Sequence, residues 1–160
     1  GFLPNNIIVM KVVLQRVTEA SVHVDNNQVS KINNGLLLLW GVERGDIEED
    51  SIALSDKIGN LRIFSDKENK MNLSVKYIQG EILIVSQFTL SANVKKGNRP
   101  SFINSEDPKL ADQLIKIAVE NFEQNGITTK TGKFGALMDI KLVNNGPVTI
   151  ILSSKDSTIS

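Results

Sequence analysis

The chain has 160 residues, which is enough for one domain with a substantial hydrophobic core. Lysine and arginine together number 18, as do aspartate and glutamate, so a nucleic-acid partner would have to meet a local basic patch instead of a global field. The absence of cysteine excludes disulfides, thiolate catalysis and zinc–thiolate sites, and it agrees with a reducing compartment such as the cytoplasm. No apolar run reaches the ~18 residues of a membrane span.

The first part of the chain is typical of β structure. Residues 1–9 precede Met10 and are taken as a cloning remnant or a natural extension, outside a single domain of residues 10–153. Residues 8–17 predict a strand, residues 20–24 and 28–32 predict a hairpin around the turn cluster 25–27, and residues 36–42 predict a buried strand. His23, the single histidine, lies in an alternating stretch, which favours a surface strand position over a general base.

The next stretch changes to helical periodicity. Asp46 and Glu49 have the spacing of a capping box, although aspartate replaces the usual serine or threonine. The helix that they predict carries its apolar face on Ile47, Leu54, Ile58 and Leu61. A polar loop at residues 65–72 and a strong strand at residues 81–90 follow.

A second helix is predicted after the polar loop of residues 94–108. Asp107 and Pro108 suit the N-cap and the first helical position, and Gly126 suits the end of the helix. Its apolar stripe is Leu110, Leu114, Ile117 and Ala118. Residues 127–131, 137–143 and 148–152 predict late strands, and residues 154–160 predict a flexible tail.

These elements predict an α+β domain with many antiparallel strands and two main helices. Two helices would cover only part of so many strands. A second subunit would bury the sheet face that they leave exposed, which weakly favours a dimer.

Three segments are candidates for chemistry or binding. Residues 86–90, S-Q-F-T-L, end the strongest strand, where polar residues are often functional; local bonds made by Ser86 and Thr89 are an equally good explanation. In the small-residue turn of residues 132–136, Phe134 offers a ring for base stacking, although packing of this ring on the core is favoured. Lys95, Lys96 and Arg99, near Phe102, suit phosphate contacts or form a solvated loop.

The corner at residues 144–149, N-N-G-P-V-T, is the most distinctive feature. Gly146 tolerates backbone angles that other residues resist, and Gly146-Pro147 is the type of peptide bond in which the cis form occurs. A rigid corner of this kind can aim carbonyl groups at a ligand, although a turn before the last strand is the simpler explanation. No phosphate-binding glycine loop and no acid–base carboxylate pair occur, so an enzyme here would depend on backbone donors and on the substrate's own groups.

Several motifs in order give the chain a specific resemblance to a known family. They are M-K-V-V-L-Q-R-V at 10–17, S-Q-F-T-L at 86–90, K-G-N-R-P-S-F at 96–102, G-K-F-G-A-L-M at 132–138 and N-N-G-P-V-T at 144–149. Together they resemble the D-aminoacyl-tRNA deacylase (D-tyrosyl-tRNA deacylase) family. The resemblance implies hydrolysis of the ester that joins a D-amino acid to the 3′-terminal adenosine of tRNA, and removal of glycine from mischarged tRNA. It also implies a compact β-barrel-like homodimer with active sites at the subunit interface and without metal or cofactor.

The resemblance also implies roles for individual residues. Gly146 and Pro147 would form a cis corner that enters the partner's pocket and clashes with an L side chain, whereas a D side chain or a hydrogen would point away. Arg16 would brace the partner's Gly-Pro loop. The adenosine would be taken by Phe134 with Gly135, Ala136 and Met138.

The catalytic segment implied by the resemblance is Ser86, Gln87, Phe88 and Thr89. Backbone N–H groups around Phe88 and Thr89 would form an oxyanion hole. The Thr89 hydroxyl is the one nucleophile candidate, but no base is evident beside it. We therefore favour activation of water with help from the ribose 2′-hydroxyl.

One position departs from the pattern, and two other functions compete. Ser91 stands where the family usually has an aromatic residue, which predicts a looser pocket rim. A non-catalytic nucleic-acid-binding module is supported weakly by the basic loop, and a structural dimer without a site leaves the ordered motifs unexplained.

Overall fold

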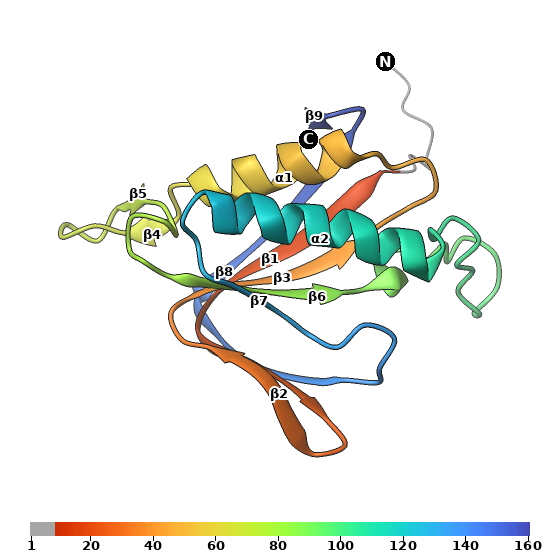
Figure 1. Ribbon diagram of the computed structural model, residues 1–160, viewed down its shortest axis with the longest axis horizontal. Helices are drawn as coiled ribbons and strands as arrows, with labels where there is room; N and C mark the ends of the chain where they lie inside the picture. The colour runs from red at the N-terminus through yellow and green to blue at the C-terminus, as the bar shows by residue number, and fades with distance from the viewer. Residues whose placement is uncertain (1–8) are drawn as a thin grey trace.

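The computed structural model describes residues 9–160 and consists of a curled sheet with two helices on one face (Figure 1). The seven-stranded sheet has the order β7-β6-β3-β1-β8-β9, with β2 beside β1. Its strands are β1 (Met10–Val24), β2 (Asn27–Ile32), β3 (Gly35–Gly41), β6 (Glu81–Ser86), β7 (Thr129–Thr131), β8 (Asp139–Lys155) and β9 (Thr158–Ile159). The helices are α1 (Glu48–Asn60) and α2 (Pro108–Gln124), and β4 (Phe64–Ser65) pairs with β5 (Met71–Leu73) separately.

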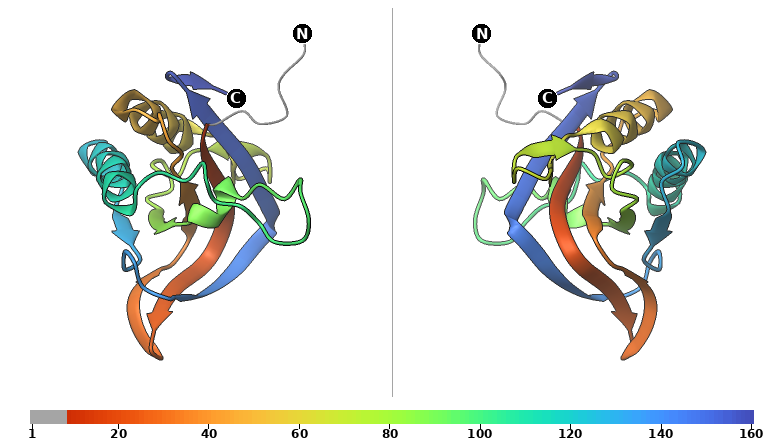
Figure 2. Two further views of the ribbon diagram at one scale, coloured as in Figure 1. Left: turned by 90° about the vertical axis from the view of Figure 1, so that its right-hand side faces the viewer. Right: turned by 90° about the vertical axis from the view of Figure 1, so that its left-hand side faces the viewer.

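The α+β class and the two main helices are confirmed, but the sheet is mixed. The predicted hairpin of β1 with β2 is confirmed, and β1 is also antiparallel to β3 and β8, whereas β3–β6 and β6–β7 are parallel pairs. The connections explain the parallel pairs. Along the sequence, α1 comes between β3 and β6, and α2 comes between β6 and β7. A helical crossover joins parallel strands, whereas a short turn joins antiparallel ones. The curl of the sheet away from the helices is visible in Figure 2.

The core lies between the helices and the sheet. α1 contributes Leu54 and Ile58, and α2 contributes Leu114, Ile115, Ala118 and Phe122. β3 is buried on both faces, as predicted: Leu36 and Leu38 join this core, while Leu37 joins a second cluster inside the curl of the sheet. The strand that carries the predicted functional segment, β6, is paired with β3 on one side and with β7 on the other.

Of the two N-caps predicted from the sequence, the one for α1 is wrong and the one for α2 is confirmed. Asp46 does not cap α1: its carboxylate accepts from the Glu43 N–H at 2.6 Å, which closes the preceding turn. Ile47 occupies the N-cap position, and Asp50 Oδ2 accepts from the Ile47 N–H at 3.1 Å. At α2, the Asp107 carboxylate accepts from two backbone N–H groups of the first turn, as predicted.

β8 runs without interruption through the corner for which two separate strands were predicted. Its pairing with β1 shifts register between Gln15 and Val17 and again between Val17 and Glu19, which lets the ladder continue on both sides of the corner. The C-terminal tail, expected to be flexible, is paired: Ser153 and Ser160 exchange two backbone hydrogen bonds, of 2.8 and 2.9 Å. Among residues 9–160, no helix is both long enough and apolar enough to cross a bilayer.

Candidate active site

A cavity of about 680 Å³ opens between the end of β6, the start of α2 and the loop before β8. Residues 86–89 line one side, and residues 134–138 line another. The two segments lie about fifty residues apart in the sequence. The structure therefore brings together the S-Q-F-T-L and G-K-F-G-A-L-M segments, which the sequence suggested separately.

The segment of residues 86–89, for which a catalytic role was expected, changes from strand to 3₁₀-helix at the cavity. Ser86 ends β6, the Gln87 N–H donates to the Trp40 carbonyl at 2.9 Å, and residues Phe88–Ser91 form one 3₁₀ turn. The first N–H groups of a helix have no acceptor within that helix. Phe88 and Thr89 open this turn, so their N–H groups are suited to bind an oxyanion.

The side chains of this segment do not form a nucleophile–base pair. Gln87 Nε2 donates to Thr89 Oγ1. His23 lies in β1, where its Nε2 and the Ser21 hydroxyl are 2.8 Å apart, and it lines a different hollow of the surface. Over residues 9–160, no group of three histidine, aspartate or glutamate side chains is arranged to hold a metal ion. In this segment, the groups suited to bind an ester oxygen are the backbone N–H groups of Phe88 and Thr89.

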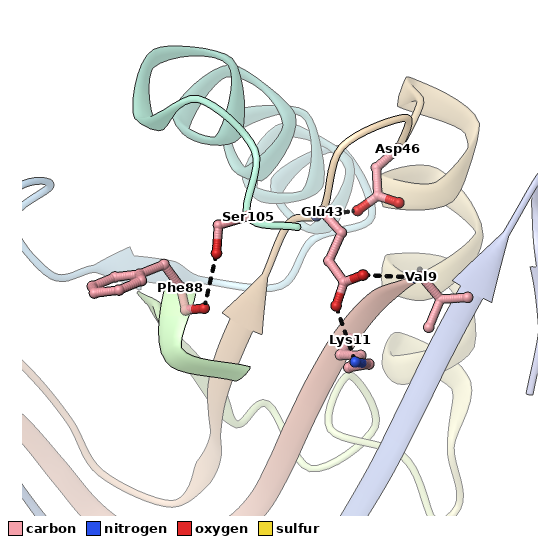
Figure 3. A network of polar contacts seen from close by, with 6 residues as sticks. All are labelled: Val9, Lys11, Glu43, Asp46, Phe88 and Ser105. Carbon is pink, nitrogen blue, oxygen red and sulfur yellow. Dashed lines mark hydrogen bonds and ion pairs between the residues drawn. The ribbon is translucent and has the colours of Figure 1, made fainter. Parts of the chain in front are cut away.

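The loop before α2 forms part of the cavity rim, which the sequence did not reveal. The Ser105 hydroxyl donates to the Phe88 carbonyl at 3.4 Å (Figure 3), and both Ser105 and Glu106 line the cavity. The rings of Phe88 and Phe102 meet edge to face with their centroids 5.0 Å apart. The N-cap signal at Asp107 was the one hint, since it put these residues just before a helix of the core.

A buried acidic group supports this rim from behind. Glu43 is 2% exposed, and its carboxylate accepts from Lys11 Nζ at 3.0 Å and from the Val9 N–H at 3.1 Å (Figure 3). Glu43 also forms an isolated antiparallel bridge with Ser105. Burial raises the pKa of the neighbouring Asp46 to about 7, against the lowering effect of its bond from the Glu43 N–H; nearby acidic groups raise it further.

The loop of residues 132–138 contributes residues 134–138 to the cavity lining. A side chain at Gly132 would come within 2.8 Å of Met138 Sδ, and Gly135 has a φ of +74°, a conformation that favours glycine. Phe134 is half-buried: its ring packs against the main core and also lines the cavity. Core packing and a role in the cavity, weighed as alternatives from the sequence, therefore both apply to Phe134.

The Gly146-Pro147 corner lies outside this cavity. The peptide bond is cis, and Asn145, Gly146 and Pro147 are all exposed. None of the three lines the cavity of its own chain. Gly146 has a φ of +132°, and a Cβ there would come within 2.9 Å of both Arg16 Nη2 and Val148 Cγ2, so the position requires glycine.

Arg16 holds the corner of its own chain, whereas the sequence led us to expect it against the partner's loop. The side chain is only 8% exposed; its Nε donates to the Asn145 carbonyl at 2.9 Å, and its Nη1 donates to the Ile63 carbonyl at 2.7 Å. The difference arises because the register shift of β1 brings Arg16 beneath the bend of β8. The Asn144 amide closes the same bend by bonding both backbone groups of Val148.

Comparison with known proteins identifies the family. The family model described as D-Tyr-tRNA(Tyr) deacylase matches residues 13–153. The chain belongs to this family. It is 55% identical to a D-aminoacyl-tRNA deacylase of Flavobacterium psychrophilum over 148 residues, 92% of this chain and 99% of the relative. It is 51% identical to the D-aminoacyl-tRNA deacylase of Aquifex aeolicus over 147 residues, with the same coverage.

The names of these relatives describe a hydrolase family, and solved structures share the fold of this chain. The c-Myc DNA Unwinding Element Binding Protein matches with a TM-score of 0.84 and 40% identity, over 91% of this chain and 99% of that chain. A probable eukaryotic D-amino acid tRNA deacylase matches with a TM-score of 0.77 over 91% of this chain and 100% of that chain; at 17% identity it supports the fold alone.

The one departure from the family motifs lies away from the cavity. Ser91 is 5% exposed and does not line the cavity. We therefore no longer expect a looser rim at this position.

Proposed function

We propose that this protein hydrolyses the ester bond between a D-amino acid and the 3′-terminal adenosine of tRNA. The observation that carries the proposal is the cavity in which residues 86–89 face residues 134–138. It combines backbone donors for an ester carbonyl with a partly buried aromatic ring for an adenine. The two bacterial relatives are 55% and 51% identical to this chain over nearly their whole length, and their names support the same substrate class. Such an enzyme would act in the cytoplasm, where tRNA is charged.

In the proposed reaction, a water oxygen attacks the ester carbonyl carbon. The N–H groups of Phe88 and Thr89 stabilise the negative oxygen that develops, and the ribose 2′-hydroxyl helps to remove the proton of the water. The bond from the carbonyl carbon to the ribose 3′-oxygen then breaks, and this oxygen takes up the proton. The products are the free amino acid and tRNA with its terminal hydroxyl restored.

Selectivity is assigned to the Gly146-Pro147 corner of a partner subunit. The corner is exposed, is held from beneath by Arg16 and lies outside its own cavity, which suits insertion into the cavity of a second copy. Backbone oxygen atoms at the α-carbon of the substrate would clash with an L side chain and tolerate a D side chain. Glycine has no side chain to exclude, so glycyl-tRNA should also be hydrolysed.

The test uses one tRNA charged with the D or the L enantiomer of the same amino acid, and the same tRNA charged with glycine. Hydrolysis of the D ester should be at least ~100-fold faster than that of the L ester, since the clash is worth several kcal/mol. Glycine should be removed at a measurable rate. Equal rates for the two enantiomers would refute the chiral filter, and no hydrolysis of any ester would refute the enzyme.

A non-catalytic nucleic-acid-binding module is the second candidate. It is favoured by the name of the structural relative with 40% identity, which refers to DNA binding. Salt-dependent binding of duplex DNA, together with failure to hydrolyse any aminoacyl-tRNA, would support this function over the esterase.

A further inference from the structure

The loop of residues 92–105 carries a local positive charge beside the cavity. It contains Lys95, Lys96 and Arg99 and no aspartate or glutamate, whereas the whole chain is neutral, with 18 basic and 18 acidic residues. Figure 1 shows this loop, in green, projecting at one end of the molecule beyond the start of α2. This is the local basic patch that a neutral protein needs in order to attract a polyanion.

The three cations are free to meet a ligand. All three side chains are exposed. The ion pairs found within residues 9–160 use Lys11, Lys31, Lys70, Lys116 and Lys130 instead. In the described part of the chain, therefore, no carboxylate lies within ion-pair distance of the loop cations.

The loop is also fixed against the catalytic segment. Asn93 and Ser101 exchange two backbone hydrogen bonds, of 2.8 and 2.9 Å, which close the base of the loop. Phe102 then packs on Phe88 with a centroid distance of 5.0 Å. Three residues span at most ~11 Å, so the Cα of Arg99 lies within that distance of the Cα of Phe102. Arg99 is thus held near Phe88, which lines the cavity.

We propose that this loop binds the phosphates of the tRNA acceptor strand that precede the terminal adenosine. The inference rests on the proposed function, because an adenosine in the cavity must leave its 5′-phosphodiester strand at the mouth. Lysine and arginine beside that strand would release counterions and add affinity without reading sequence. The contacts would hold the tRNA and would contribute nothing to attack on the ester.

The test compares two substrates that differ only in phosphates: D-aminoacyl-tRNA and the same D-aminoacyl ester of free adenosine. The variant is Lys95→Gln, Lys96→Gln, Arg99→Gln. Its KM for the charged tRNA should rise at least ~10-fold, and the slope of log KM against log salt should shrink by about one for each phosphate contact removed. Its kcat and KM for the adenosine ester should stay close to the wild-type values.

A matched control removes the same charge at the opposite end of the molecule, near β4 and β5 (Figure 1). The control is Lys67→Gln, Lys70→Gln, Lys76→Gln, all at exposed positions. It should leave the KM for charged tRNA within about twofold of the wild-type value, because distant exposed charges are screened at physiological salt. Melting curves establish that both variants fold.

An unchanged KM in the loop variant, or equal increases in the loop and control variants, would overturn the inference while leaving the proposed function intact. An equal rise of KM for the adenosine ester would overturn it too, since phosphate contacts cannot explain that result. If the wild-type protein hydrolyses neither ester, the proposed function fails. Fluorescence anisotropy with uncharged tRNA then tests phosphate binding by the loop. Weaker tRNA binding by the loop variant alone supports the inference, and equal binding by the wild type and both variants refutes it.

Discussion

The cavity and the Gly146-Pro147 corner are two parts of one proposed site, but their shapes are opposite. The cavity is concave and combines backbone groups of residues 86–89 with the loop of residues 134–138. The corner is an exposed bend, with the buried Arg16 guanidinium beneath it. A convex corner cannot enclose a substrate. If the corner reads the α-carbon, the pocket that it serves must therefore belong to another chain.

The largest expected effect comes from Gly146→Ala, which changes the corner alone. A Cβ at this position would come within 2.9 Å of both Arg16 Nη2 and Val148 Cγ2, at a φ that L residues rarely adopt. The corner must shift, and a displacement of about 1 Å in the groups that position the substrate can reduce kcat/KM ~100-fold. Single-turnover deacylation of D-aminoacyl-tRNA measures this loss.

Gly126→Ala is the matched control for that change. Gly126 also has a positive φ, of +80°, but a Cβ there would meet no atom within 4 Å. The substitution should cost about 1 kcal/mol of stability and leave deacylation unchanged. Equal losses of activity in the two variants would mean that general destabilisation, and not the corner, controls the rate.

Arg16→Lys should weaken selectivity. Lysine keeps the charge but cannot donate to both the Asn145 and Ile63 carbonyls in the fork geometry of arginine. Loss of one such bond should destabilise the fold by about 2 kcal/mol. The looser corner should narrow the ratio of D to L hydrolysis about tenfold. A preserved ratio in the folded variant would separate Arg16 from selectivity.

Phe134→Ala tests the cavity without altering the corner. Loss of a stacked base typically costs 1–3 kcal/mol, so the KM for D-aminoacyl-tRNA should rise about tenfold with little change in the D-to-L ratio. Tyr77→Ala, which removes a 73% exposed aromatic residue that does not line the cavity, should change neither value. A loss of chiral selectivity in Phe134→Ala would mean that the cavity also reads the α-carbon.

The stability of the folded protein should depend on pH through Asp46, which bonds the backbone of Glu43 behind the cavity rim. Burial raises its pKa from 3.8 to about 7, so the folded state binds this proton more tightly than the unfolded chain. The stability that this adds is fully present below about pH 4 and is lost as the pH rises through about 7. As the pH rises from 5 to 8, the urea concentration at the unfolding midpoint should therefore decrease for the wild-type protein relative to the Asp46→Asn variant. Parallel pH profiles for the two proteins would contradict this.

Thr89→Ala should have the smallest effect. The Thr89 hydroxyl accepts a bond from Gln87, and within residues 9–160 neither a histidine nor a carboxylate is bonded to it. Substrate assistance predicts a kcat within about threefold of the wild-type value, whereas loss of a true nucleophile costs ~10³-fold or more. A kcat near zero with normal binding of the substrate would establish Thr89 as catalytic.

The sequence predicted best where local signals act alone. The Asp107 cap, the buried β3 and the hairpin around residues 25–27 all follow from short patterns, and each is confirmed. Prediction from the sequence failed where contacts with residues elsewhere in the chain determine the local structure. Asp46 has cap spacing, but its carboxylate bonds the Glu43 N–H, and the direction of β6 depends on the helical crossover before it.

The candidate site shows the same division. The resemblance assigned residues 86–89, residues 134–138 and a partner's corner to one substrate, but no local pattern in the sequence showed that the first two segments line one cavity. The placement of Ser105 at the rim depends on an isolated bridge to Glu43, about sixty residues away, and no local pattern encodes such a contact. Arg16 was expected beside a partner's corner, whereas a register shift that is invisible in the sequence places it under the corner of its own chain.

Mixed dimers test most directly whether the cavity and the corner of one site come from different chains. One chain carries Gly146→Ala, and the other carries Ala136→Trp, which fills the cavity. Each homodimer should be nearly inactive, whereas statistical mixing of the chains should restore roughly a quarter of wild-type D-aminoacyl-tRNA hydrolysis, because half of the dimers then hold one intact site. No recovery of activity in demonstrated mixed dimers would contradict the account and place both parts of each site in one chain.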